Sequence, residues 1–135
     1  MSPNPVFLYV EDEPFSRMVM DTLLVRALGY KNLNMFDNSE RFMERVQALS
    51  SRPDIIFLDI HVHPHNGFEM LSMLRDDPTY SDTRVIALTA SVMNEEVEML
   101  KRSGFNGAIA KPIDQVQFPN LLQSILNGEE IWHIV

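Results

Sequence analysis

Short apolar runs alternate with amphipathic segments along the chain. Five of the runs are β-prone, and they occupy residues 6–10, 33–36, 55–58, 85–88 and 108–110. After each run, apolar residues recur at the spacing of a helix with one buried face. Repeated strand–helix units favour a parallel sheet with right-handed crossovers and helices on both faces. The pattern therefore predicts a single α/β domain of five strands and five helices.

Some segments make this prediction more specific. The unbroken apolar run at residues 55–58 predicts a strand that is buried on both faces. The Asp-Asn-Ser-Glu segment at residues 37–40 is typical of a helix start and predicts that the second helix begins there. Met93, Val97 and Leu100 put an apolar stripe on the fourth helix.

Polar residues stand where the predicted strands end. An acidic cluster at residues 11–13 follows the first strand, Asp59 the third, Thr89 the fourth and Lys111 the fifth. In a doubly wound sheet, functional groups gather beyond the carboxyl ends of the strands. Each residue alone has a simpler explanation, since an aspartate after a strand often caps a turn or a helix. Together they predict a crowded acidic site, provided that the first and third strands are neighbours.

Such a site needs a counter-charge. Two carboxylates about 4 Å apart repel by roughly 4 kcal/mol at an effective dielectric constant of about 20. Oxygen ligands in a chain without Cys favour Mg²⁺ or Mn²⁺ over zinc. Lys111 adds an ammonium group and Thr89 a hydroxyl, a combination that suits a phosphoryl group received by a carboxylate. Asp59 is the predicted nucleophile, because it ends the most buried run and has no acidic neighbour in the sequence.

In their order and spacing, these motifs resemble the receiver domain of two-component response regulators. The resemblance covers Val6 to about Asn127, and it rests on Tyr9-Val10-Glu11-Asp12-Glu13, Ile56-Phe57-Leu58-Asp59-Ile60, Gly67, Leu88-Thr89-Ala90 and Lys111-Pro112. It implies a flavodoxin-like, doubly wound, five-stranded parallel sheet of order 2-1-3-4-5 with five helices. The receiver domain would span residues 1–128, followed by a C-terminal tail at 129–135.

The resemblance also implies a magnesium site. Asp59 would be the phospho-acceptor and a ligand of Mg²⁺, which Asp12 would bind directly and Glu11 largely through a water molecule. The main-chain carbonyl of His61 would complete the protein ligands. The side chains of His61 and Ser91 occupy positions that flank the phosphoryl group in the family, where they tune its lifetime.

Thr89 and Lys111 would contact the phosphoryl oxygens, and the Lys111–Pro112 peptide would be cis, as in the family. The chain departs from the family pattern at two positions. An aromatic residue is usual three positions before the lysine, where this chain has Ala108. Proline is usual four positions after the acceptor, where this chain has His63.

By the same resemblance, the chain would be a signalling module rather than an enzyme, with self-dephosphorylation at most. A sensor histidine kinase or a phosphotransfer protein would supply the phosphoryl group, and a downstream protein would recognise the changed docking surface. The expected output face is built from the fourth helix, fifth strand and fifth helix, which could also form a homodimer. Met93, Met99 and Phe105 lie in that region.

Three other functions compete with this one. Alternating histidines at residues 61–65 suit a zinc hydrolase if that segment is extended, but Pro64 and Asn66-Gly67 predict a turn, hence an exposed loop. A flavin carrier of the same fold needs a phosphate-binding loop after the first strand, where acidic residues stand instead. A docking module that is never phosphorylated should have lost the acceptor, the acid pair or the lysine, and all are present.

Composition narrows the choice of partners. The chain has 135 residues and a formal net charge of −8. A surface this negative repels phosphate backbones and anionic lipids, so nucleic acids and membranes are not expected partners. The first residues lack the basic flank and apolar run of a signal peptide, and the absence of Cys suits a reducing compartment. A cytoplasmic location is therefore expected.

Overall fold

A computed structural model describes residues 4–91 and 93–133 of the chain. These residues contain one parallel sheet of six strands in the order β2-β1-β3-β4-β5-β6. The strands are β1 (Val6–Val10), β2 (Asn32–Phe36), β3 (Ile55–Asp59), β4 (Arg84–Thr89), β5 (Gly107–Ala110) and β6 (Ile131–His133). The predicted order 2-1-3-4-5 is confirmed, but the predicted number of strands is wrong. Residues 131–133, within the segment assigned to the C-terminal tail, pair with β5 as a sixth strand.

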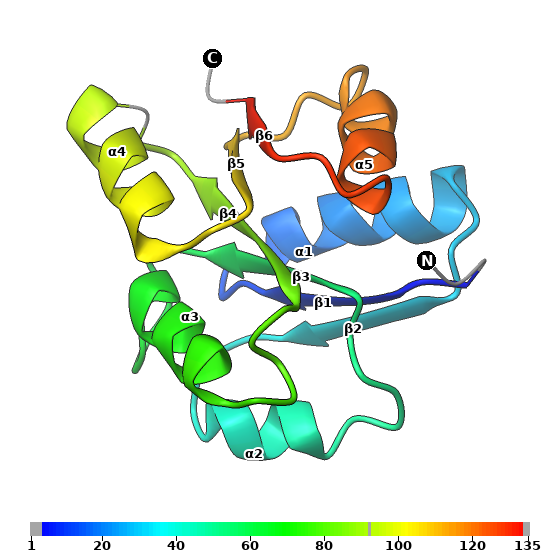
Figure 1. Cartoon of the computed structure of the whole chain (residues 1–135). Helices are drawn as coiled ribbons and strands as arrows, with labels where there is room; N and C mark the ends of the chain where they lie inside the picture. Colours follow the sequence, from blue (N-terminus) through cyan, green and yellow to red (C-terminus); the bar gives the residue numbers. More distant parts are fainter. Residues whose placement is uncertain (1–3, 92, 134–135) are drawn as a thin grey trace.

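Helices cover both faces of the sheet, as predicted. They are α1 (Pro14–Asp21), continued by the π-helical segment η1 (Thr22–Ala27), α2 (Phe42–Gln47), α3 (Gly67–Asp76), α4 (Asn94–Ser103) and α5 (Phe118–Leu126). In Figure 1, α1 and α5 lie on one side of the sheet and α2, α3 and α4 on the other. None of the helices in the described part of the chain has the length and apolar character of a membrane span.

Strand β3 separates two apolar cores. All of its residues are buried, which confirms the expectation for an unbroken apolar run in a central parallel strand. Ile56 and Leu58 face the core under α2, α3 and α4, whereas Ile55 and Phe57 face the core under α1, η1 and α5. The strand that carries Asp59 at its end is therefore held from both sides.

The second helix begins later than predicted. Residues 37–40 form a bend and a turn, and α2 starts at Phe42 after Arg41, whose φ is 50°. Ser39 is fully buried, and its hydroxyl donates to the carbonyl oxygen of His65 at 2.7 Å and accepts from the amide of His65 at 2.7 Å. This serine, in the segment that was expected to start a helix, therefore ties two loops together.

The fourth helix also differs from its predicted stripe. Val97 and Leu100 are buried as expected, but Met93 precedes the helix as its N-cap and is 60% exposed. Phe105 is 3% exposed, so it belongs to the core and is not available to a partner. Met99, at 49% exposed, remains on the surface of α4.

Candidate functional site at the strand ends

Four strand ends bring the predicted site residues to one edge of the sheet. Strands β1, β3, β4 and β5 are consecutive neighbours and run parallel. Glu11 and Asp12 follow β1, Asp59 and Thr89 are the last residues of β3 and β4, and Lys111 follows β5. The condition that the first and third strands be neighbours is met. Parallel pairing thus gathers residues that are up to 100 positions apart in the sequence.

Three carboxylates form the centre of the site. Glu11, Asp12 and Asp59 each offer an oxygen within 4.8 Å of the others. Glu11 and Asp59 are buried, and Asp12 is exposed, so the cluster is open to solvent on one side. A set of hard oxygen donors at this spacing fits a divalent cation such as Mg²⁺ or Mn²⁺.

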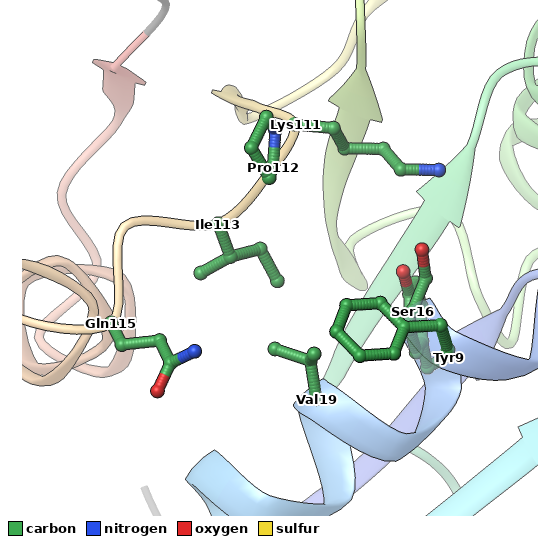
Figure 2. A pocket seen from close by; sticks show the side chains of 8 residues that line it. Tyr9, Ser16, Val19, Lys111, Pro112, Ile113 and Gln115 are labelled. Carbon is green, nitrogen blue, oxygen red and sulfur yellow. The ribbon is translucent and has the colours of Figure 1, made fainter.

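Lys111 supplies the positive charge on the protein side. Its Nζ donates to Glu11 Oε1 at 2.6 Å and to Asp59 Oδ1 at 3.3 Å. Figure 2 shows the lysine side chain extended from the loop after β5. Burial lowers the pKa of Lys111, but its hydrogen bond to Glu11 and the charge of Asp59 outweigh burial and raise the pKa overall. The ammonium group therefore stays protonated and holds the two buried acids together.

Tyr9 positions the Glu11 side chain by a hydrogen bond, a role that we did not predict from the sequence. Its hydroxyl donates to Glu11 Oε1 at 2.9 Å, in a fully buried position. Burial, and then the negative charge of Glu11, raise the pKa of Tyr9 far above its ordinary range, so the hydroxyl stays neutral and can only donate to the carboxylate. The one hint in the sequence is a residue with a polar tip inside an otherwise apolar strand.

The ionised form of Asp59 is destabilised by its surroundings. Burial raises the pKa of this carboxyl group, and the neighbouring Glu11 carboxylate raises it further. Lys111 opposes both effects without cancelling them. A bound cation would relieve this repulsion, so the electrostatics and the ligand geometry agree.

Thr89 lies at the edge of the site with its hydroxyl engaged elsewhere. The side chain is 2% exposed. Its Oγ accepts from the amide of Ser91 at 3.0 Å and donates to the carbonyl oxygen of Ser91 at 3.3 Å. In this structure the threonine therefore holds the turn between β4 and α4 closed.

A small cavity opens beside the site, between α1 and the loop after β5. Its volume is about 100 Å³, and it is lined by Tyr9, Phe15, Ser16, Val19, Lys111, Pro112, Ile113 and Gln115 (Figure 2). Phe15 is 63% exposed and Met18, on the same helix, is 56% exposed. An exposed aromatic side chain therefore borders the cavity, with an exposed methionine on the same helix, and we did not predict this exposure from the sequence.

Comparison with known proteins decides the family. The family model of the response regulator receiver domain matches residues 7–123. The chain belongs to this family. Receiver domains are signalling modules of two-component systems, which interact with histidine kinases or phosphotransfer proteins and with downstream targets, so the resemblance inferred from the sequence is confirmed.

Individual relatives agree with this assignment. The polar-differentiation response regulator DivK of Brucella anthropi is 29% identical over 124 residues, 92% of this chain and 97% of that protein. Chemotaxis response regulator CheY4 of Vibrio cholerae has the same fold, with a TM-score of 0.79 at 23% identity over 90% of this chain and 98% of that one. The Mn²⁺-bound form of response regulator Rcp1 has a TM-score of 0.74 at 22% identity, over 90% and 91% of the two chains.

Residues 61–65, which include three histidines, follow β3 of this receiver domain as a turn. His61 is exposed in the turn that follows Asp59, and the His63–Pro64 peptide is cis, as is the Lys111–Pro112 peptide. The amide of Ser39 donates to the carbonyl oxygen of His63 at 3.1 Å, which fixes the loop by its backbone. Within residues 4–91 and 93–133, no set of three metal-binding side chains includes a histidine, so the geometry does not support a zinc hydrolase.

Proposed function

We propose that this receiver domain accepts a phosphoryl group on Asp59, in a Mg²⁺-dependent reaction in the cytoplasm. The donor is a phosphohistidine of a sensor kinase or phosphotransfer protein. One observation carries the proposal: the Asp59 carboxylate lies in a cluster with Glu11 and Asp12, with oxygens within 4.8 Å, and 3.3 Å from Lys111 Nζ. This arrangement offers a nucleophile and charges of both signs where a phosphoryl group would arrive.

The transfer exchanges one bond to phosphorus for another. An Asp59 carboxylate oxygen forms a bond to phosphorus as the bond between phosphorus and the donor imidazole nitrogen breaks, and the bonding electron pair stays on the imidazole. Lys111 neutralises charge on the phosphoryl oxygens from the protein side. Mg²⁺, held by Glu11, Asp12, Asp59 and the main-chain carbonyl of His61, would supply positive charge to the same oxygens.

Thr89 and two neighbouring side chains would act after the transfer. The Thr89 hydroxyl would turn from Ser91 and donate to a phosphoryl oxygen, because a charged acceptor makes a stronger hydrogen bond than a carbonyl group. Hydrolysis of the acyl phosphate would transfer the phosphoryl group to water, release inorganic phosphate and return Asp59 to its carboxylate. His61 and Ser91 would tune how fast that water arrives.

The experiment that tests the proposal is intact-mass spectrometry of the wild-type protein incubated with acetyl phosphate. With Mg²⁺ present, we expect a mass gain of one phosphoryl group, and peptide mapping after hydride reduction of the acyl phosphate should locate it at Asp59. With the metal removed by EDTA, we expect no gain. Equal labelling with and without metal, or a label on another residue, would contradict the proposal.

We also propose that Phe15 and Met18 form the docking surface for the phosphoryl donor, because Phe15 is exposed at the cavity that Lys111 also lines and Met18 is exposed on the same helix. The donor for this test is an autophosphorylated histidine kinase domain that phosphorylates the wild type. With this donor, Phe15→Ala should transfer about 30-fold more slowly than the wild type, since a buried aromatic anchor is worth about 2 kcal/mol in an interface. Labelling by acetyl phosphate should stay unchanged.

The matched control is Leu28→Ala, which removes an apolar side chain, 36% exposed, just beyond the far end of the helical segment that α1 and η1 form. This variant should transfer at the wild-type rate. Equal rates for Phe15→Ala and the wild type would rule out this surface as the docking site.

A further inference from the structure

The sixth strand covers the sheet edge that β5 would otherwise expose. Strand β6 runs along β5 between α4 and α5 (Figure 1). Gly107 is paired with Ile131, Ala108 with Trp132 and Ile109 with His133. The expected output face of α4, β5 and α5 therefore carries β6 as its outermost strand.

Strand β5 has the shape needed to receive this partner. A Cβ atom on Gly107 would overlap the carbonyl oxygen of Ile131 and lie 3.1 Å from its amide nitrogen, and the three atoms nearest to it all belong to the Ile131 backbone. Glycine weakens a strand interior and marks the close approach of another backbone. The closest contacts of a side chain at this position would thus all be with the β6 backbone, and glycine avoids them.

Trp132 joins β6 to the rest of the fold. It packs against the core that lies under α4, beside Ala108, whose small side chain leaves room for the ring. Lys101 Nζ, on α4, lies 5.3 Å from the centre of the indole ring. Arg84 donates to the carbonyl oxygen of Glu129 at 2.8 Å, just before β6. The strand is thus held by a sheet edge, by α4 and by an arginine of β4.

These contacts connect β6 to the phosphorylation site by two short routes. Along the sheet, β5 leads from Ala108 to Lys111, whose amide donates to the carbonyl oxygen of Thr89 at 2.9 Å. Through α4, the hydroxyl of Thr89 holds Ser91 in the turn that precedes the helix, and α4 carries Lys101. If Thr89 turns toward a phosphoryl group, the turn loses both hydrogen bonds and α4 is free to shift away from Trp132.

We propose that the β5 edge beside α4 is a strand-binding surface, occupied by the chain's own β6 while Asp59 is unmodified, and that phosphorylation of Asp59 releases β6. This inference rests on the proposed function, since it requires that Asp59 be phosphorylated. Strand β6 has three residues, all of them partly exposed, so its docking belongs to the least stable part of the fold. The surface that it uncovers suits an extended segment with an aromatic side chain.

Trp132 is the only tryptophan of the chain and so reports on β6 directly. Its emission and its quenching by acrylamide are measured on the full chain with Mg²⁺, before and after acetyl phosphate, while intact mass follows the label. We expect a red shift and a quenching constant about twofold higher in the labelled protein. A mass gain with an unchanged or blue-shifted emission would overturn the release of β6 and leave the proposed function standing. No mass gain would overturn both.

Gly107→Ala tests the same coupling in reverse. The added methyl group should displace β6, so Trp132 should emit at longer wavelength before any phosphorylation. Because coupling between two equilibria is reciprocal, this variant should bind the phosphoryl mimic beryllofluoride about fivefold more tightly than the wild type. Equal affinities for the mimic together with a red-shifted emission would contradict the coupling, and an unshifted emission would contradict the close contact of Gly107 with β6.

A pair of substitutions on α4 provides the matched control. Lys101→Met removes the cation over the indole ring and should shift Trp132 emission to the red, whereas Arg102→Met, at the next exposed residue of the same helix, should not. Equal shifts in the two variants would mean that α4 does not hold β6 through this contact.

Discussion

Asp59→Asn is expected to take up no phosphoryl group from acetyl phosphate or from a phosphohistidine donor. The amide is a poor nucleophile and carries no charge, although it has nearly the same shape as the carboxylate. Intact mass should therefore show the full label in the wild type and none in the variant. Asp76→Asn, a change at an exposed aspartate at the end of α3, is the matched control and should label normally. Residual labelling of Asp59→Asn would place the acceptor elsewhere.

The same variant should be more stable than the wild type, which separates lost chemistry from lost folding. The pKa of Asp59 is raised in the folded state, first by burial and then by Glu11, so the folded chain binds a proton there more tightly than the unfolded chain does. The wild type consequently loses stability as the pH rises from about 4, the ordinary pKa of an aspartate, through the raised value. Below this window the carboxyl group is protonated in both states and the penalty vanishes.

We therefore expect Asp59→Asn to gain about 1–3 kcal/mol in unfolding free energy at pH 7, comparable to the repulsion between two partly screened carboxylates. The gain should shrink toward zero near pH 3.5. Urea denaturation at the two pH values measures the difference, with Asp76→Asn as the control. Equal stability of Asp59→Asn and the wild type at pH 7 would show that the three acids do not repel one another as the structure indicates.

Lys111→Met should have the opposite effect on stability. Its ammonium group lies 2.6 Å from a Glu11 side chain that is only 1% exposed, so the substitution leaves a buried carboxylate without this cation. Breaking a buried ion pair by removing one partner costs about 3 kcal/mol or more. The rate of phosphoryl uptake should fall about 100-fold, the usual cost of losing one charge-stabilising group in a reaction site.

Two comparisons make the Lys111 experiment specific. Lys31→Met, at an exposed lysine just before β2, should change neither urea denaturation nor labelling rate. In the double variant with Asp59→Asn, the loss of stability should be smaller than in Lys111→Met alone, because one of the two acids that the lysine holds is gone. A fully additive double variant would contradict the shared contact.

The grouping of the site residues could be predicted from the sequence because parallel topology largely determines which residues meet. Once five apolar runs are recognised as parallel strands, their ends must converge, and the residues that follow them must meet. Asp59 and Lys111 are 52 positions apart, yet their contact needs no information beyond strand order. The same argument explains why β3, buried on both faces, was assigned correctly from an unbroken apolar run.

The parts that were missed depend on contacts between distant segments. Ser39 lies in a segment typical of a helix start, but its hydroxyl donates to the backbone of His65 instead, and that loop is remote in sequence. Strand β6 has three residues, too few for a periodic pattern to be visible. The glycine at position 107 has meaning only once the Ile131 backbone lies beside it.

The two cores on either side of the sheet have a consequence for the evolution of the sequence. The cavity beside Phe15 lies over the face with α1 and α5, whereas Trp132 and Lys101 belong to the face with α4. Alternate residues of β3 point into different cores and share only the backbone between them. If Phe15 receives the phosphoryl donor and β6 controls the output, as proposed, substitutions that alter recognition of the donor can accumulate in one layer without repacking the other. The specificity for the donor and the specificity for the downstream partner could then diverge independently.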